Sequence, residues 1–266
     1  MTVFRHRRGF GSVSIVSDYY DLVFEWGREN RGLLADQKKV EGRLDVWKSL
    51  LVKGGLSPRS VLDIACNDGS LARMMAEAHL GEEFTLCDLS PAAIGYVKSR
   101  PFRGLADAIV GDADKLPFPD NSFDLAVLSH VVEHLPHPRE AIVEASRVAK
   151  VVLVEVPLQD ALLSNAAGLV RKRRTGMPRS VNGVGHLHFF ADRTFRTMTE
   201  EWGGVTILRS TTYLPSGRSR WKIATGRVLG SRMYGRLLEV HAVYLVEKGH
   251  QRSAPSRVAR GETRPC

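Results

Sequence analysis

The stretch Val61–Met75, VLDIACNDGSLARMM, predicts a strand, a tight turn and a helix in immediate succession. Its first residues are apolar, small and turn-forming residues follow at positions 65–69, and apolar side chains then recur at helical spacing. Such a turn points backbone N–H groups and the positive end of a helix dipole at the edge of a sheet, and small side chains let a ligand approach the backbone. The stretch therefore predicts a place to hold a nucleotide-like molecule.

Acidic residues follow the next strands in the same way. Glu83–Leu89 (EFTLCDL) reads as a second strand that ends at Asp88, and a third acid, Asp112, opens the stretch Gly111–Phe118 (GDADKLPF). An acid at the end of the second strand can accept hydrogen bonds from both ribose hydroxyls of an adenosine ligand. Together with Asp63, these acids predict an adenosine site at three successive strand ends.

Strand and helix patterns continue to alternate along the chain. Phe123–Ser129 and Val151–Val156 (VVLVEV) read as buried strands, and a helix from about 139 to 149 separates them. This alternation predicts a parallel sheet with right-handed crossovers and with ligands at the carboxyl ends of the strands. The acids named above all fall at that edge.

Taken together, these residues resemble the class I S-adenosylmethionine-dependent methyltransferases, most closely the small-molecule branch with LPF and HxxEHL signatures. The resemblance covers residues 61–157 and includes Leu116–Phe118 (LPF) and His130–Leu135 (HVVEHL) in the family's order. It departs from the family at the first turn, where Ala65 and Asn67 stand in place of the usual glycines. Because asparagine tolerates the left-handed conformation better than other non-glycine residues, we expect the turn to keep its shape.

The resemblance implies S-adenosyl-L-methionine as cofactor and assigns a role to each matching position. The residues that it places at the cofactor are Asp63, Ala65, Asn67 and Gly69 at the methionyl end, Asp88 at the ribose, Leu89, Asp112 and Ala113 at the adenine, and His130 after the fourth strand.

The resemblance also implies the fold class: an α/β, Rossmann-like, doubly wound sheet of seven strands, mostly parallel, with an antiparallel C-terminal hairpin and an N-terminal helical lid. We expect residues 205–211 and 238–247 to form the hairpin. The expected domain runs from 16 to 248, with the lid at 16–57 and a substrate-side insert at 157–190. Residues 1–15 and 249–266 carry no apolar periodicity, and we expect a disordered basic head and a disordered tail.

Composition is consistent with one domain. The 266 residues are 43% hydrophobic, which is enough for a full core. The chain has neither a long uncharged apolar run nor a secretory leader pattern, so we expect a soluble, cytoplasmic protein. Cys66, Cys87 and Cys266 lack metal-ligand spacing, and a His-x-His pair without a third ligand is weak, so no metal is predicted.

Methyl transfer needs alignment of acceptor, methyl and sulfur, and a hydroxyl acceptor also needs a base, for which histidine is suited near neutral pH. The candidate catalytic residues are His134, His186 and His188, with His130 as a further base candidate. His134 occupies the EHL position, where a structural or cofactor-side role competes. His186 and His188 share one face of an extended segment, and for His186 anchoring of the loop by hydrogen bonds is the alternative to catalysis.

We expect a small-molecule acceptor, with O-methylation of a natural-product, sugar or lipid-like compound favoured. The net charge of +9 includes a basic cluster at Arg171–Arg174, which would meet an anionic acceptor, a lipid surface or only water. A nucleic-acid base is disfavoured because no Pro-Pro-aromatic element follows the fourth strand. The alternatives are a catalytically silent, cofactor-binding partner subunit and a methyltransferase that acts on protein or RNA.

Overall fold

The computed structural model describes residues 17–25, 37–158, 187–188, 190–202, 204–212 and 240–248. The predicted head and tail, His186 and most of the insert at 157–190 lie outside the described residues. What was expected of them remains a prediction.

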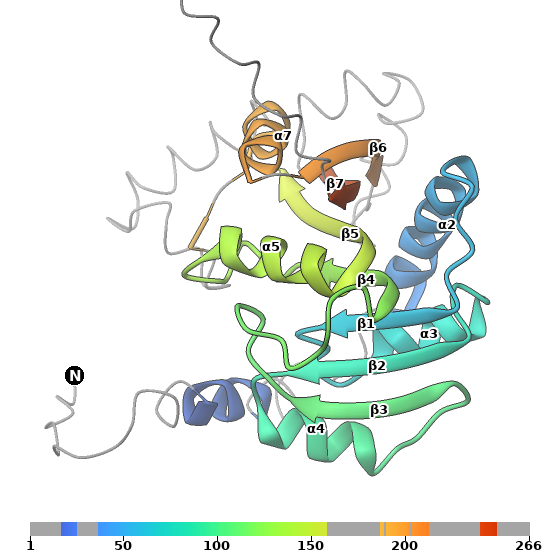
Figure 1. Ribbon diagram of the computed structural model, residues 1–266. Coiled ribbons are helices and arrows are strands. Elements are labelled where there is room, and N and C mark those ends of the chain that lie inside the picture. The colour runs from blue at the N-terminus through green and yellow to red at the C-terminus, as the bar shows by residue number, and fades with distance from the viewer. Residues whose placement is uncertain are drawn as a thin grey trace, which may run out of the picture.

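The described strands form one sheet in the order β3-β2-β1-β4-β5-β7-β6 (Figure 1). Their bounds are Ser60–Ile64 (β1), Glu83–Asp88 (β2), Leu105–Val110 (β3), Phe123–Ser129 (β4), Ala149–Leu158 (β5), Gly204–Thr212 (β6) and Val240–Lys248 (β7). Strands β1 to β5 pair in parallel, whereas β7 lies between β5 and β6 and is antiparallel to both. The predicted seven-stranded, mostly parallel sheet with an antiparallel C-terminal hairpin is confirmed.

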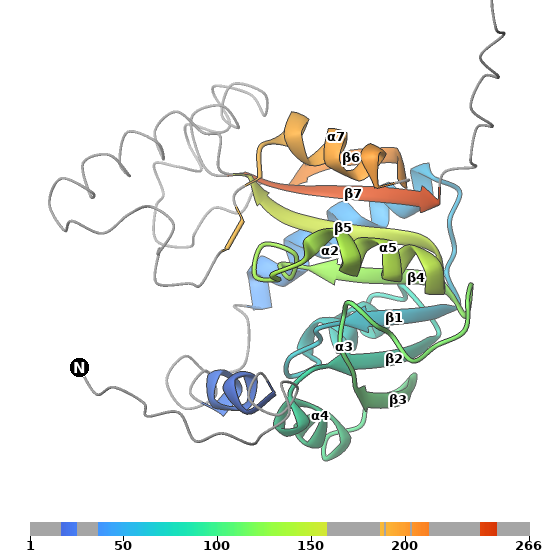
Figure 2. The ribbon, with the colours of Figure 1, turned by 60° about the vertical axis from the view of Figure 1, so that its left-hand side comes forward.

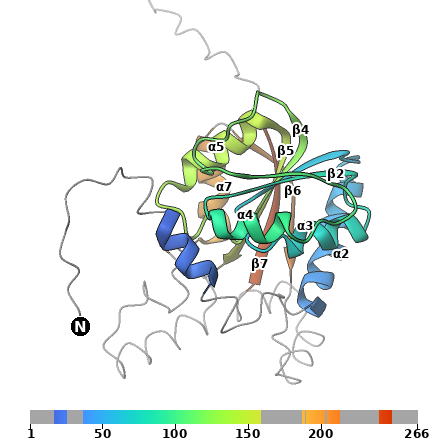
Figure 3. The ribbon, with the colours of Figure 1, turned by 90° about the horizontal axis from the view of Figure 1, so that it is seen from below.

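Helices cover both faces of this sheet, as the view along it shows (Figure 3). Their bounds are Gln37–Lys53 (α2), Ser70–Glu77 (α3), Pro91–Lys98 (α4), Pro138–Val148 (α5) and Asp192–Glu201 (α7). Trp47 of α2 and Met75 of α3 are fully buried in the core on one face, and Ile142 of α5 and Phe195 of α7 are buried on the other. The doubly wound arrangement predicted from the sequence is therefore present.

Local sequence explains where the helices begin. Ser90 caps α4, because its Oγ accepts a hydrogen bond from the N–H of Ala93 at 3.0 Å, and Pro91 supplies the preset φ of a first helical residue. In α5, buried residues recur at 138, 141, 142, 145 and 148, which is the spacing of one helix face. Each helix thus brings an apolar stripe to the sheet.

The N-terminal part of the chain contributes a helix over residues 17–25 and helix α2. Helix 17–25 lies beside α4, near the carboxyl ends of the parallel strands (Figure 2). Helix α2 packs on the sheet through Leu44, Trp47, Leu50 and Leu51, all buried. The N-terminal helices therefore reach the ligand edge and also complete the core. Among the described helices, none has both the length and the hydropathy needed to cross a bilayer.

Candidate functional site

The three acids singled out in the sequence lie at one edge of the sheet. Asp63 stands next to the end of β1, Asp88 is the last residue of β2, and Asp112 follows β3 by two residues. Because β1, β2 and β3 are adjacent and parallel, their carboxyl ends lie side by side at the same edge of the sheet. The structure thus brings these acids together, as predicted.

The turn after β1 adopts left-handed backbone at alternate residues. The φ angles are 57° at Ala65, 53° at Asn67 and 71° at Gly69. The expectation that Asn67 tolerates this conformation is confirmed, and Ala65 also adopts it although alanine gains nothing from it. At Gly69 a Cβ atom would lie 3.0 Å from Leu86 Cδ2, so packing as well as conformation requires glycine there.

Asp88 is tied into this turn by backbone donors. The N–H of Asn67 donates to Asp88 Oδ2 at 2.8 Å, and the N–H of Ser90 donates to Oδ1 at 2.9 Å. Burial raises the pKa of Asp88, and the two backbone hydrogen bonds counteract part of that rise. Each carboxylate oxygen keeps a second lone pair, so Asp88 can still accept hydrogen bonds from a ligand's hydroxyls.

Asp63 is a buried acid with an unsatisfied oxygen. Its exposed fraction is 2%, and its Oδ2 has no hydrogen-bond partner in the described part of the chain. Burial and then the charges of Asp88 and Asp68 raise its pKa to about 7, although the charge of Arg43 acts in the opposite direction. A buried acceptor of this kind needs an explanation, and a positively charged ligand group beside it would provide one.

An ion pair that the sequence did not reveal lies next to Asp63. Arg43 of α2 donates through Nε to Oε2 of Glu155 at 2.8 Å and through Nη2 to the hydroxyl of Ser129. Glu155 is fully buried in β5. The only signal in the sequence was an acid inside the apolar run Val151–Val156, because such a residue needs a partner. Nothing in the sequence identified Arg43 as that partner.

His130 lies between two buried carboxylates at the end of β4. Its Nδ1 is 3.1 Å from Glu133 Oε1, its Nε2 is 3.9 Å from Glu155 Oε2, and its φ is 57°. Burial alone would raise the pKa of Glu133, but the hydrogen bond and charge of His130 outweigh it and leave this pKa below its usual range. Left-handed backbone at a non-glycine residue costs about 1–2 kcal/mol, and such residues cluster at functional sites.

His188 holds the end of the insert against the segment that follows β4. Its Nε2–H donates to the carbonyl of Leu135 at 2.9 Å, and its ring stacks on Phe190 at 6.1 Å between centroids. The N–H groups of Leu187 and His188 both donate to the carbonyl of Glu133, at 2.7 and 3.0 Å. His188 therefore anchors this segment, whereas the anchoring predicted for His186 lies outside the described residues. In a neutral His188 ring, Nδ1 is the nitrogen that can accept a proton. His134 is half-buried in the same segment.

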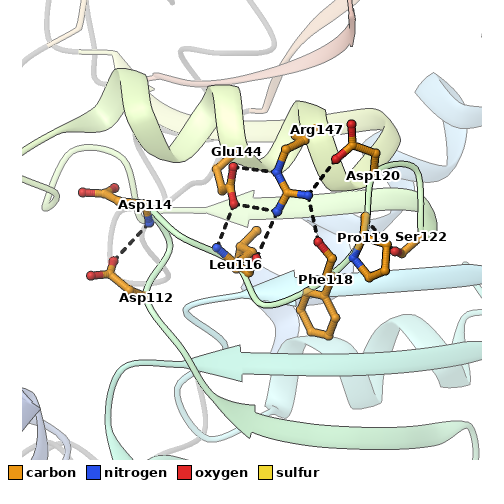
Figure 4. Close-up of polar contacts among 9 residues, drawn as sticks. All are labelled: Asp112, Asp114, Leu116, Phe118, Pro119, Asp120, Ser122, Glu144 and Arg147. Carbon is orange, nitrogen blue, oxygen red and sulfur yellow. Dashed lines mark hydrogen bonds and ion pairs between the residues drawn. The ribbon is translucent and has the colours of Figure 1, made fainter.

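The loop after Asp112 is held by two residues of α5 (Figure 4). Arg147 donates to the carbonyls of Leu116 and Phe118 at 3.0 and 2.8 Å. Its guanidinium also pairs with Glu144 at 2.7 Å and with Asp120 at 2.8 Å, and Glu144 in turn accepts from the N–H of Leu116. These contacts brace the LPF signature, and the loop's own start is closed by a 3.0 Å hydrogen bond from the N–H of Asp114 to Asp112 Oδ1.

Two further positions predicted at the adenine, Leu89 and Ala113, have apolar side chains and so make no polar side-chain contacts. Leu89 is half-buried and its carbonyl accepts from Ser17 Oγ at 3.2 Å. Ala113 is buried beside the exposed Asp112. Within the described ranges, no group of three or more His, Cys, Asp or Glu side chains could hold a metal ion.

Known proteins resemble this chain over its central part. Residues 62–151 match the family model described as a methyltransferase domain. A demethylmenaquinone methyltransferase of Paenarthrobacter aurescens is 38% identical over 92 residues, which are 35% of this chain and 35% of the relative. A ubiquinone/menaquinone biosynthesis C-methyltransferase UbiE of Bartonella tribocorum is 32% identical over 139 residues, 49% of this chain and 53% of the relative. The chain thus spans about a third to a half of the curated relatives it matches.

A solved structure extends the likeness to most of the fold. Magnesium protoporphyrin IX methyltransferase of Synechocystis PCC 6803, solved with bound S-adenosylhomocysteine, superposes with a TM-score of 0.56 at 17% identity. The superposition covers 88% of this chain and 99% of that protein. At this identity the likeness concerns the fold. The family match over residues 62–151, the strand order and the acids at the ends of the first three strands agree with the predicted resemblance to class I S-adenosylmethionine-dependent methyltransferases.

Proposed function

We propose that this chain transfers a methyl group from S-adenosylmethionine to a small-molecule acceptor. The observation that carries the proposal is the juxtaposition of Asp63, the left-handed turn 65–69, Asp88 and Asp112 at three adjacent strand ends. The cofactor, when bound, supplies a methyl group on a positively charged sulfur. The chain's own part is to bind that molecule, align the acceptor and exclude water.

The donor and acceptor groups at this edge fit such a cofactor. Asp88 is oriented by two backbone N–H groups and would accept from the ribose hydroxyls. Asp112 and Ala113 would lie at the adenine. The unsatisfied Oδ2 of Asp63 would pair with the ammonium of the methionyl end, with the turn 65–69 beside it. These roles are proposals that the geometry supports.

Cofactor binding is tested first, by calorimetric titration with S-adenosylhomocysteine. Asp88→Ala removes up to two charge-assisted hydrogen bonds, each worth about 1.5–3 kcal/mol, so binding should weaken at least about tenfold. Asp107→Ala is the matched control, because Asp107 is an exposed acid on neighbouring β3. Unchanged affinity in the Asp88 variant would refute the cofactor assignment.

The acceptor that we favour carries an acidic hydroxyl, with methylation on oxygen. Loss of the hydroxyl proton activates the oxygen, and in a phenol it also activates the neighbouring ring carbon. Carbon is the competing acceptor atom, because a curated relative is named a C-methyltransferase. A base therefore assists transfer to either atom, and methyl release from labelled cofactor to hydroxylated aromatic compounds tests the reaction. Cofactor binding without release to any acceptor would favour the silent partner subunit instead.

The base is sought among His134, His186 and His188. If one of them removes the proton, its Gln variant should lower kcat by about 100-fold or more and abolish an ionisation near neutral pH in the rate profile. His188 would act through Nδ1, since its Nε2 donates to Leu135. A Gln variant that keeps the full pH profile is not the base. Full profiles in all three variants would either move the base to another residue, such as His130, or show that positioning suffices.

An anionic acceptor is the finer form of this proposal. The basic cluster Arg171–Arg174 follows β5 in the chain, and segments that follow the strands of such a sheet commonly carry specificity. Replacing its four residues by Ser should raise KM and flatten the salt dependence of KM, while cofactor affinity stays unchanged. An unchanged KM would exclude the cluster from acceptor binding.

A further inference from the structure

One face of helix 17–25 is turned toward the cofactor edge. Ser17, Tyr20, Asp21 and Phe24 recur at helical spacing and are half-buried or buried. Tyr19, Leu22 and Val23 lie on the other side and are 61%, 71% and 46% exposed. The helix therefore presents a defined inner face.

Three members of that inner face contact the segment that follows Asp88, from Leu89 to Tyr96 in α4. Ser17 Oγ donates to the carbonyl of Leu89 at 3.2 Å. Asp21 Oδ1 accepts from the hydroxyl of Ser90 and from the N–H of Ala92 at 3.0 Å, at the beginning of α4. The ring of Phe24 meets that of Tyr96 edge to face at 5.9 Å between centroids. These contacts fix the helix against the end of β2 and the helix that follows it.

Tyr20 is the fourth member, placed between the anchors Ser17 and Asp21. Within the described residues no hydrogen bond uses its hydroxyl. Its ring lies edge to face with the ring of Tyr19, at 5.5 Å between centroids. Burial and then the charges of Tyr19, Asp88, Asp112 and Asp114 raise its pKa, so the phenol keeps its proton and remains a donor. A half-buried aromatic donor thus lies on the inner face of the helix, close enough to the acids assigned to the ribose and the adenine to feel their charge.

We propose that Tyr20 binds the adenosine half of the cofactor, with its ring against the nucleoside and its hydroxyl as a hydrogen-bond donor, and that Ser17 and Asp21 hold it there. The inference rests on the proposed function, because it names a residue of the same site. An aromatic ring stacks on any base, and a tyrosine loses little conformational entropy when it does so. The anchors explain why the helix is held at this place.

The test compares two neighbouring tyrosines. Tyr20→Leu should weaken binding of S-adenosylhomocysteine and of adenosine alone by a similar factor, about 5- to 100-fold, because the lost contact concerns the nucleoside. Tyr19→Leu is the matched control on the exposed face of the same helix, and it should leave both affinities within about twofold. Equal affinities in wild type and Tyr20→Leu would overturn the inference.

A second measurement separates contact from folding, since Tyr20→Leu could displace the helix. In Tyr20→Trp, adenosine should change the added indole fluorescence relative to wild type, whereas in Tyr19→Trp it should not. No adenosine-dependent change at position 20 would overturn the inference even if Tyr20→Leu binds weakly. Asp88→Ala, measured alongside, distinguishes failure of the cofactor assignment from failure of the Tyr20 inference. If it too binds normally, the cofactor assignment fails, and if only the Tyr20 variants bind normally, this inference alone fails.

Discussion

Asp63 couples the candidate site to pH. Its pKa is raised to about 7 in the folded protein, mainly by burial, so the folded state holds a proton that the unfolded chain releases near pH 4. The stability that this proton contributes is complete below the unfolded pKa and is lost as pH rises through about 7. A cationic ligand prefers the ionised carboxylate, so cofactor binding should expel the proton.

We predict that affinity for S-adenosylmethionine rises between pH 6 and pH 8 and that binding near pH 7 releases protons. Titrations in buffers of different ionisation enthalpy measure that release. Asp63→Asn should bind the cofactor more weakly, show no proton release from this group, and at pH 8 stabilise the ligand-free protein by on the order of 2 kcal/mol. Proton release that persists in Asp63→Asn would assign the titration to another group.

Ala65 carries a conformational cost that glycine would remove. At φ 57° a Cβ is disfavoured by about 1 kcal/mol, and the greater flexibility of glycine in the unfolded chain offsets part of the gain. Ala65→Gly should therefore raise the free energy of unfolding slightly, by about 0.5 kcal/mol. In denaturant titrations Asn67→Gly serves as the comparison and should change stability less, since asparagine already tolerates φ 53°. A loss of stability in Ala65→Gly would mean that the methyl group packs usefully.

At the scale of elements, α5 supports the loop that presents Asp112. Arg147 reaches two loop carbonyls and two carboxylates at once, which a lysine cannot do because it lacks the planar fork. We predict that Arg147→Lys lowers the free energy of unfolding by on the order of 1–2 kcal/mol and speeds amide hydrogen exchange over residues 112–122.

Arg139→Lys is the control for that variant, since Arg139 is exposed on the same helix. It should leave both stability and exchange unchanged. Because Arg147 holds the loop that carries Asp112, Arg147→Lys should also weaken cofactor binding more than Arg139→Lys does. Normal exchange in the Arg147 variant would show that the rest of the loop keeps its shape without the guanidinium.

At the scale of the whole molecule, β7 decides where the chain can be shortened. It lies between β5 and β6, and Ala242 to Val246 are fully buried. Ending the chain after residue 248 should leave the melting temperature within about 2 °C of the full chain, because it removes no described contact. Ending it after residue 239 removes β7, so β5 and β6 both lose the strand that they pair with. This truncation should prevent folding, as measured by solubility and circular dichroism. A large loss of stability in the 248 truncation would place tail residues in the folded domain.

The sequence by itself determined the order of elements and the position of the three acids. Apolar runs, turn residues and helical spacing are local signals, and parallel strands bring their carboxyl ends to one edge whatever the details of packing. Asp63, Asp88 and Asp112 could therefore be placed together from the chain alone. The left-handed turn at Asn67 was predictable for the same reason, since it depends on one residue's own conformational freedom.

Only the tertiary structure decided which distant side chains meet. Arg43 and Glu155 are 112 residues apart, and no periodicity links a residue of α2 to one of β5. The contact of Ser17 with Leu89 spans 72 residues, and it depends on how helix 17–25 docks beside α4. His188 illustrates the same limit: its spacing to His186 suggested chemistry, whereas its hydrogen bond to Leu135 follows from the packing of two loops. Side-chain pairing across the fold is set by packing and burial, which a linear pattern does not contain.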